Sequence, residues 1–276
     1  MNACDMTGLS EGIYEMSNEE YHASAPLSKS SLSQILKSPA HYKASLDKEF
    51  AETAAMRLGT AFHCAVLEPD RFKEEYRIPP SVDRRTKKGK EEYAEWAKQG
   101  YSEISNSDYE KVKKMREAIM SHKTLSPLFN SGNAELSVFH NYDYYDRNIW
   151  LKCRPDWFNR KKKVIVDLKS TMDASPQGFS KSCAKYGYAL QAWMYSMICE
   201  KVTGQPITAF VFAAVESSPP YGVAGYILDQ KSLELGQAKF YSAIDTYLKC
   251  IDTDEWPSYG DRIEELTLPQ WAFYDE

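Results

Sequence analysis

The chain has 276 residues, 43% of them hydrophobic and 26% charged, and its formal net charge is −5 at pH 7. This length and composition suit one large domain with a core of its own. No stretch approaches the roughly 18 apolar residues of a membrane-spanning helix, and residues 1–12 contain no apolar signal region, so we expect a cytoplasmic protein. The acidic balance counts mildly against a protein that only coats nucleic acid.

The six cysteines indicate buried free thiols. Most of them have apolar neighbours, as buried thiols do. No two of them form a C-x-x-C pair, and a zinc knuckle or an iron–sulfur cluster would need clustered cysteines. They are Cys4, Cys64, Cys153, Cys183, Cys199 and Cys250.

The first half of the chain has the spacing of helices. Serines in the segment 27–32 precede an apolar-periodic run, which is typical of a helix cap. Pro39 follows Ser38, where we expect that helix to end and a second to begin. The pattern further predicts a buried helix at 54–68 that Pro69 stops, a basic loop at 84–90 that contains a glycine, and helices at 91–98 and 107–122.

Strands are predicted from residue 134 onward, where the alternation of apolar residues changes. Three come first, at 135–140, 148–158 and 163–169, and the turn 159–162 joins the last two in a hairpin. The remaining predictions are helices at 175–183 and 189–202, strands at 207–216 and 222–228, and a closing helix at 232–251.

This order of elements predicts an α/β (α+β) fold in which helices flank a central mixed sheet. We expect an N-terminal extension at 1–25, followed by a single domain at 26–276. Within that domain we expect a mainly helical part at 26–133, a core at 134–252 and a C-terminal tail at 253–276.

Two aspartates and a lysine lie on the two strands of the predicted hairpin. Asp156 stands near the end of one strand, and Asp167 and Lys169 stand at the end of its partner, with ten residues between the two aspartates. Residues two apart in a strand share a face, so Asp167 and Lys169 point the same way. The short turn brings Asp156 alongside them, and two carboxylates and an ammonium then converge at one end of the sheet.

This convergence points to metal-assisted hydrolysis of a phosphodiester. Two close carboxylates repel each other unless a cation lies between them, and oxygen ligands favour Mg²⁺ or Mn²⁺. Lys169 cannot bind that metal as an ammonium, so it would hold the scissile phosphate or the attacking water. The alternative is a surface hairpin in which Asp167 and Lys169 form a simple salt bridge, because D-x-K alone is a common pattern.

The pattern P-D-x10-D-x-K resembles that of the PD-(D/E)xK nuclease superfamily. His63 ends a G-x-x-x-H pattern, and Gln191 and Tyr195 form a Q-x-x-x-Y pattern, as in the RecB-like and RecE-like members. The segments 27–32 and 37–42 are similar to the first helices of RecE-type exonucleases (exonuclease VIII). Without the resemblance, the alternative interpretation is that His63 is an ordinary core histidine. Gln191 and Tyr195 would then form an ordinary polar edge of their helix.

The resemblance implies a restriction-endonuclease-like core with an N-terminal helical section. It implies that His63, Asp156 and Asp167 are metal ligands, and that Gln191 and Tyr195 belong to the catalytic group with Lys169. Glu135 is a further candidate ligand, and simple structural pairing is the equal alternative for it.

The resemblance also implies a function. RecE-type enzymes digest double-stranded DNA in the 5′→3′ direction and leave 3′ single-stranded tails for a RecT-type annealing protein, in prophage or phage recombination. The resemblance also implies that this chain forms a ring-shaped homotetramer. The alternatives are another PD-(D/E)xK nuclease, RecB-like or an endonuclease, and a non-catalytic DNA-binding module that retains the fold.

Basic and hydroxyl side chains are candidates for contact with DNA. A flexible basic loop can bind phosphates, the hairpin turn adjoins the strands that carry the aspartates, and hydroxyls before a helix can bind a terminal phosphate. For each group the alternative is an ordinary surface loop, a solvated turn or a helix cap. The candidates are Arg84, Arg85, Lys87, Lys88, Arg154, Lys161, Lys162, Ser28 and Ser30.

Overall fold

The computed structural model describes residues 10–47, 52–269 and 273. The outer parts of the predicted terminal segments, 1–9 and 270–276 except 273, lie outside the described residues. The helices are α1 (Asn18–Ala23), α2 (Lys29–Lys37), α3 (Pro39–Leu46), α4 (Ala54–Leu67), α5 (Pro69–Glu75), α6 (Lys87–Ala97), α7 (Asn106–Ser121), a 3-10 turn η1 (Ser126–Asn130), α8 (Pro176–Tyr186), α9 (Tyr188–Thr203) and α10 (Gln230–Thr253). The strands are β1 (Gly12–Tyr14), β2 (Tyr76–Arg77), β3 (Ser102–Glu103), β4 (Asn133–Ala134), β5 (Ser137–Tyr144), β6 (Arg147–Cys153), β7 (Trp157–Asn159), β8 (Val164–Thr171), β9 (Ala209–Glu216) and β10 (Val223–Tyr226).

Side-chain caps decide where several helices begin. The Ser28 side chain accepts a hydrogen bond from the backbone of Ser31 at the start of α2, and Ser38 does the same for α3, which opens on a proline. These two caps are as the sequence predicts. The basic segment 84–90 is different, because Thr86 caps a helix that begins at residue 87. Only the first part of that segment is therefore a loop.

The strands form a central mixed sheet in the order β10-β9-β8-β7-β4 and a smaller sheet in the order β1-β5-β6. In the central sheet β8 is parallel to β9, and the other neighbours are antiparallel. The predicted class, helices around a central mixed sheet, is confirmed. Residues 12–14, which the sequence placed in an N-terminal extension, pair with β5.

The prediction of one continuous strand at 148–158 is wrong, because this segment forms two strands that belong to two different sheets. β6 pairs with β5, and β7 pairs with β8. The break contains Pro155, which has no N–H group to donate to a ladder. The three strands predicted at 135–140, 148–158 and 163–169 therefore do not form one continuous sheet, although the hairpin β7–β8 does form.

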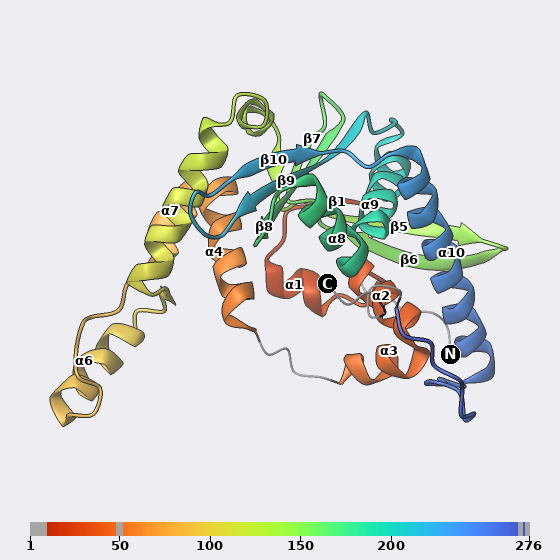
Figure 1. Cartoon of the computed structure of the whole chain (residues 1–276), viewed down its shortest axis with the longest axis horizontal. Coiled ribbons are helices and arrows are strands. Elements are labelled where there is room, and N and C mark those ends of the chain that lie inside the picture. The colour runs from red at the N-terminus through yellow and green to blue at the C-terminus, as the bar shows by residue number, and fades with distance from the viewer. Residues whose placement is uncertain (1–9, 48–51, 270–272, 274–276) are drawn as a thin grey trace.

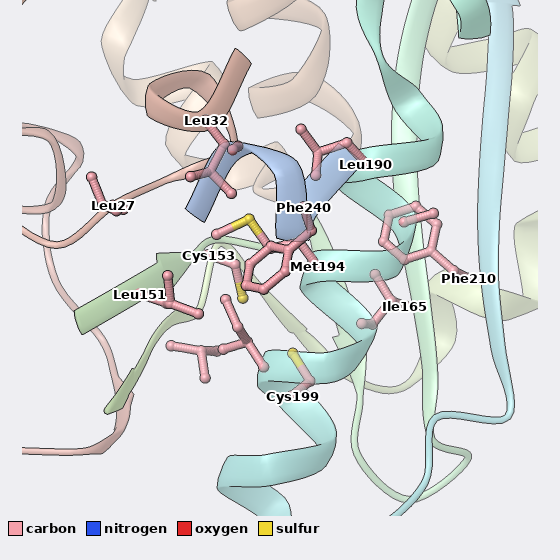
Figure 2. Close-up of a cluster of buried hydrophobic side chains, with 14 of the residues drawn as sticks. Leu27, Leu32, Leu151, Cys153, Ile165, Leu190, Met194, Cys199, Phe210 and Phe240 are labelled. Atoms are coloured by element: carbon pink, nitrogen blue, oxygen red, sulfur yellow. The ribbon is translucent and has the colours of Figure 1, made fainter. Parts of the chain in front are cut away.

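Both faces of the central sheet are covered, and the alternation along β8 sends its side chains to different cores. Ile165 packs with residues of α9 and α10, and Figure 2 shows it in one cluster with Leu190 and Phe240. Val166 and Leu168 pack into a second cluster with residues of α4 and α7. Figure 1 shows α4 and α7 on one side of the molecule and α9 and α10 on the other.

The segment 76–103, here called the arm, projects away from this body. It consists of β2, β3 and α6, and Figure 1 shows α6 far from the central sheet. No helix within the described ranges is long and apolar enough to cross a membrane. The five described cysteines are free thiols, and four of them are buried, as the sequence predicts.

Candidate active site

Asp156 reaches the central sheet through the break between β6 and β7. Trp157 pairs with Val166, so Asp156 stands one position beyond that pair, opposite Asp167. The Asp156 carboxylate accepts a hydrogen bond from the backbone N–H of Leu168, with 2.7 Å between Oδ2 and the nitrogen. The hairpin therefore brings the two aspartates together as the sequence predicts.

Asp167 is fully buried and faces α9. Its Oδ1 accepts a hydrogen bond of 2.5 Å from Nε2 of Gln191. Its Oδ2 lies 2.6 Å from Nζ of Lys169, with which it forms an ion pair. Burial raises the pKa of Asp167 to about 6, although the positive charge of Lys169 opposes the shift. The site therefore holds a carboxylate that is costly to keep charged.

Lys169 remains a charged ammonium in this setting. Burial alone would lower its pKa, but the negative charges of Asp167 and Asp156 outweigh burial and raise the pKa above its usual value. Its Nζ lies over the ring of Tyr188, 4.9 Å from the ring centroid. The side chain is thus held between a carboxylate and an aromatic face, near the C-terminal end of the central strand β8.

His63 approaches the same place from α4. Its Nε2 lies 3.4 Å from Oδ2 of Asp156 and 2.5 Å from the backbone oxygen of Leu168. Gly59 stands one turn earlier on α4, and a Cβ atom there would lie 3.4 Å from Oγ of Ser170. This distance is an ordinary van der Waals contact, so the packing of α4 on β8 that brings His63 beside Asp156 does not require a glycine at this position.

Glu135 lies next to Asp156 in an unusual backbone conformation, with φ of 51°. Its N–H donates to the backbone oxygen of Asp156, and its Oε2 lies 2.9 Å from Nε of Arg154. Burial and the nearby charge of Asp156 raise the pKa of Glu135 to about 7, against the opposing charges of His63 and Arg154. Glu135 therefore combines structural pairing with a place at the edge of the site.

The burial of Glu135 predicts how stability depends on pH. Its folded-state pKa of about 7 lies above the ordinary value of 4.5, so its contribution to stability is fully present below about pH 4.5 and is lost as the pH rises through about 7. Denaturant unfolding of metal-free protein should show wild-type stability falling across this window relative to Glu135→Gln. A difference between the two proteins that stays constant from pH 4.5 to 7 would show that Glu135 is not desolvated.

The donors around Asp156 and Asp167 fit a hard divalent cation. Carboxylate and carbonyl oxygens and one imidazole lie within reach of one another at Asp156, Leu168 and His63. Asp167 Oδ2 is buried against the ammonium of Lys169, and a divalent cation would further offset the burial that raises the pKa of this carboxyl. Within the described part of the chain, no group of three or more His, Cys, Asp or Glu side chains is arranged as a metal site, since Asp167 is turned to Lys169 and Gln191.

Tyr195 stands one turn after Gln191 on α9. Its ring meets the ring of Phe210 edge-on, with 6.3 Å between centroids. Burial raises the pKa of Tyr195 well above its usual value, and the charges of both aspartates add to the shift. In the described ranges it makes no hydrogen bond to either aspartate, so the structure places Tyr195 near the site but joins only Gln191 to it.

The basic residues of the arm are partly neutralised by neighbours. Arg84 pairs with Glu103 and stacks on Tyr93, and Arg85 pairs with Asp83. On α6, Lys88 is exposed, and Nζ of Lys87 lies 3.9 Å from Oε1 of Glu91. The arm therefore presents fewer free cations than its sequence suggests.

The other candidates for DNA contact are spread over the molecule. Lys161 and Lys162 are exposed at the turn before β8, which is the opposite end of that strand from Lys169. The hydroxyls of Ser28 and Ser30 lie 2.7 Å apart at the start of α2. Arg154 is paired with Glu135, as described above. The structure thus does not gather these residues at one place.

Two groups at the site were not singled out from the sequence. The backbone oxygen of Leu168 contacts His63, and any residue type would supply it. Lys29 contacts the α8–α9 corner, where its Nζ donates to the backbone oxygen of Tyr186, 157 residues away, and the ring of Tyr188, two residues on, lies against Lys169. No local pattern distinguishes Lys29 from the other lysines.

The chain is similar to known proteins in family and in fold. The model of a family described as a PDDEXK-like domain of unknown function (DUF3799) matches residues 28–269. The crystal structure of a candidate exonuclease from Eubacterium rectale is 14% identical, covers 94% of this chain and 98% of that chain, and has a TM-score of 0.63. At this identity the likeness shows the fold alone.

A phage related exonuclease from Haemophilus somnus 129PT is 15% identical and covers 64% of this chain and 91% of that chain. Its TM-score is 0.34. None of the curated proteins matches the chain.

Proposed function

The chain belongs to the family of PDDEXK-like domains of unknown function (DUF3799), within the PD-(D/E)xK nuclease superfamily, and from this premise we propose that it is a metal-dependent exonuclease acting on double-stranded DNA. The observation that carries the proposal is the convergence at β7 and β8. Asp156 and Asp167 stand opposite each other, Lys169 pairs with Asp167, and His63 lies beside Asp156.

The proposed reaction is hydrolysis of a phosphodiester bond. Mg²⁺ or Mn²⁺, held by Asp156, Asp167 and His63, would supply an activated water and stabilise negative charge on phosphorus. Lys169 aims its ammonium at the phosphate or at the attacking water. Gln191 holds Asp167 in place through its hydrogen bond to Oδ1, so that the carboxylate keeps its orientation during the reaction.

The resemblance to RecE-type exonucleases supports a finer proposal. The enzyme would digest in the 5′→3′ direction and leave 3′ single-stranded tails for a RecT-type annealing partner in prophage recombination. It would work in the cytoplasm as a homotetramer, as a single nuclease domain. Arg84, Arg85, Lys87 and Lys88 on the arm, with the turn lysines at 161 and 162, are the proposed contacts to the DNA backbone.

The test uses three substrates with the protein and Mg²⁺: linear duplex labelled at its 5′ ends, linear duplex labelled at its 3′ ends, and a covalently closed circle. The 5′ label should be released first as short products, while the circle stays intact because it offers no end. Early release of the 3′ label would reverse the polarity. Rapid cutting of the circle would show an endonuclease, and binding without cleavage would show a non-catalytic module.

A further inference from the structure

Lys29 places a second ammonium beside the candidate active site. It is half-buried at the start of α2, and its Nζ donates a hydrogen bond of 2.5 Å to the backbone oxygen of Tyr186. Tyr186 ends α8, and the next residue, Gly187, turns the chain into α9. The ring of Tyr188 lies against Nζ of Lys169. The α8–α9 corner, residues 186–188, therefore contacts both lysines.

The surroundings of Lys29 are unfavourable for a cation. Burial lowers its pKa to about 8, and the positive charge of Lys169 adds to the shift, while only the charge of Asp167 opposes it. Across the described ranges, no carboxylate lies within ion-pair distance of Lys29. Lys169 has its own carboxylate in Asp167, whereas the partner of Lys29 among the described residues is a backbone oxygen.

A structural role accounts for only part of this arrangement. A cation at the end of α8 satisfies one of the last carbonyls of that helix and interacts favourably with its dipole. A neutral donor would satisfy the same carbonyl without repulsion from Lys169. A half-buried cation that has no carboxylate partner among the described residues is unfavourable, and an anion between the two lysines would offset that cost.

We propose that Lys29 and Lys169 together bind a phosphate group of the DNA substrate. The proposal rests on the proposed function and adds to it a phosphate position next to the aspartates, on the side formed by α2 and the α8–α9 corner. An internal phosphodiester and a terminal phosphate share this chemistry, because each presents negative oxygens to the two ammonium groups.

The experiment measures how DNA affinity depends on salt for four proteins: the unmodified chain, Lys29→Gln, Lys29→Arg and Lys37→Gln. Glutamine keeps a neutral donor for the Tyr186 carbonyl and removes the charge. Lys37 is exposed at the other end of the same helix, so Lys37→Gln removes an equal charge away from the site. Fluorescence anisotropy is recorded with Ca²⁺, which binds carboxylates but suits the reaction geometry poorly, and a gel confirms intact DNA.

The slope of log affinity against log salt should fall by about 1 in Lys29→Gln, as for the loss of one phosphate contact. Lys29→Arg and Lys37→Gln should keep the slope of the unmodified chain. The duplex is used with 5′-phosphate and with 5′-hydroxyl ends. A loss confined to the phosphorylated ends assigns the site to a terminal phosphate, and an equal loss on both assigns it to an internal phosphodiester.

Two outcomes overturn the proposal, and they differ from each other. If the unmodified chain binds DNA and Lys29→Gln matches it in affinity and slope, Lys29 only caps α8, and the proposed function stands. If the unmodified chain binds no DNA, both proposals fail. Thermal unfolding confirms that each variant is folded, and Lys29→Met serves as a second neutral variant should Lys29→Gln not fold.

Discussion

Lys169→Ala is expected to slow DNA cleavage by about 100- to 1,000-fold, the usual cost of losing one preorganised electrostatic group. Asp156 and Asp167 remain in this variant, so the metal should still bind. It should bind more tightly than in the wild type, because the ammonium that now lies 2.6 Å from Asp167 is gone. Added metal should not restore the rate, since an ion cannot occupy the position of the lysine.

The measurement pairs a calorimetric titration with Mg²⁺ and a single-turnover cleavage rate. Lys201→Ala is the matched control, because Lys201 is exposed near the end of α9 and has no part in the site. It should bind metal and cleave like the wild type. A Lys169→Ala protein that cleaves at nearly the wild-type rate would mean that the D-x-K match is a coincidence and the site is misassigned.

Asp156→Asn is expected to lower the affinity for Mg²⁺ by at least about 10- to 100-fold, the loss that follows even from changing a residue that supports a metal ligand. The substitution removes one of the two negative charges that would hold the metal, and Asp167, the other, is already paired with Lys169. The asparagine oxygen can still accept the hydrogen bond from the backbone of Leu168, so the strand pairing should survive. The effect therefore reports on charge and not on folding.

The readout is the cleavage rate as a function of Mg²⁺ concentration. The wild type should lose all activity in excess chelator, and Asp156→Asn should need far more metal for half its maximal rate and recover part of it. The contrast with Lys169→Ala is the sharpest test, because only the aspartate variant should respond to added metal. Full wild-type activity in excess chelator would refute the metal mechanism.

The sequence by itself determined the features that depend on neighbours along the chain. Asp167 and Lys169 share a face because side chains alternate along a strand, and the turn after Asn159 is short enough to return β8 beside β7. The caps at Ser28 and Ser38 are local for the same reason, since each side chain bonds a backbone group three residues on.

The family resemblance predicted one further site residue, His63, which is distant in sequence from Asp156. Composition and spacing alone leave His63 as an ordinary core histidine. The motif order singled it out, and the structure places its Nε2 3.4 Å from Asp156. Gln191 was likewise singled out and donates to Asp167, while Tyr195, in the same motif, makes no such bond in the described residues.

Only the tertiary structure decided how distant segments pair. The strand expected at 148–158 divides at Pro155 because β6 pairs with β5 while β7 pairs with β8. The alternation of apolar residues is the same in either sheet, so it could not predict this division. The arm arginines meet carboxylates that no spacing rule selects. Lys29 reaches Tyr186 across 157 residues. A contact of that span depends on the packing of α2 against the α8–α9 corner, and no local pattern of residues encodes it.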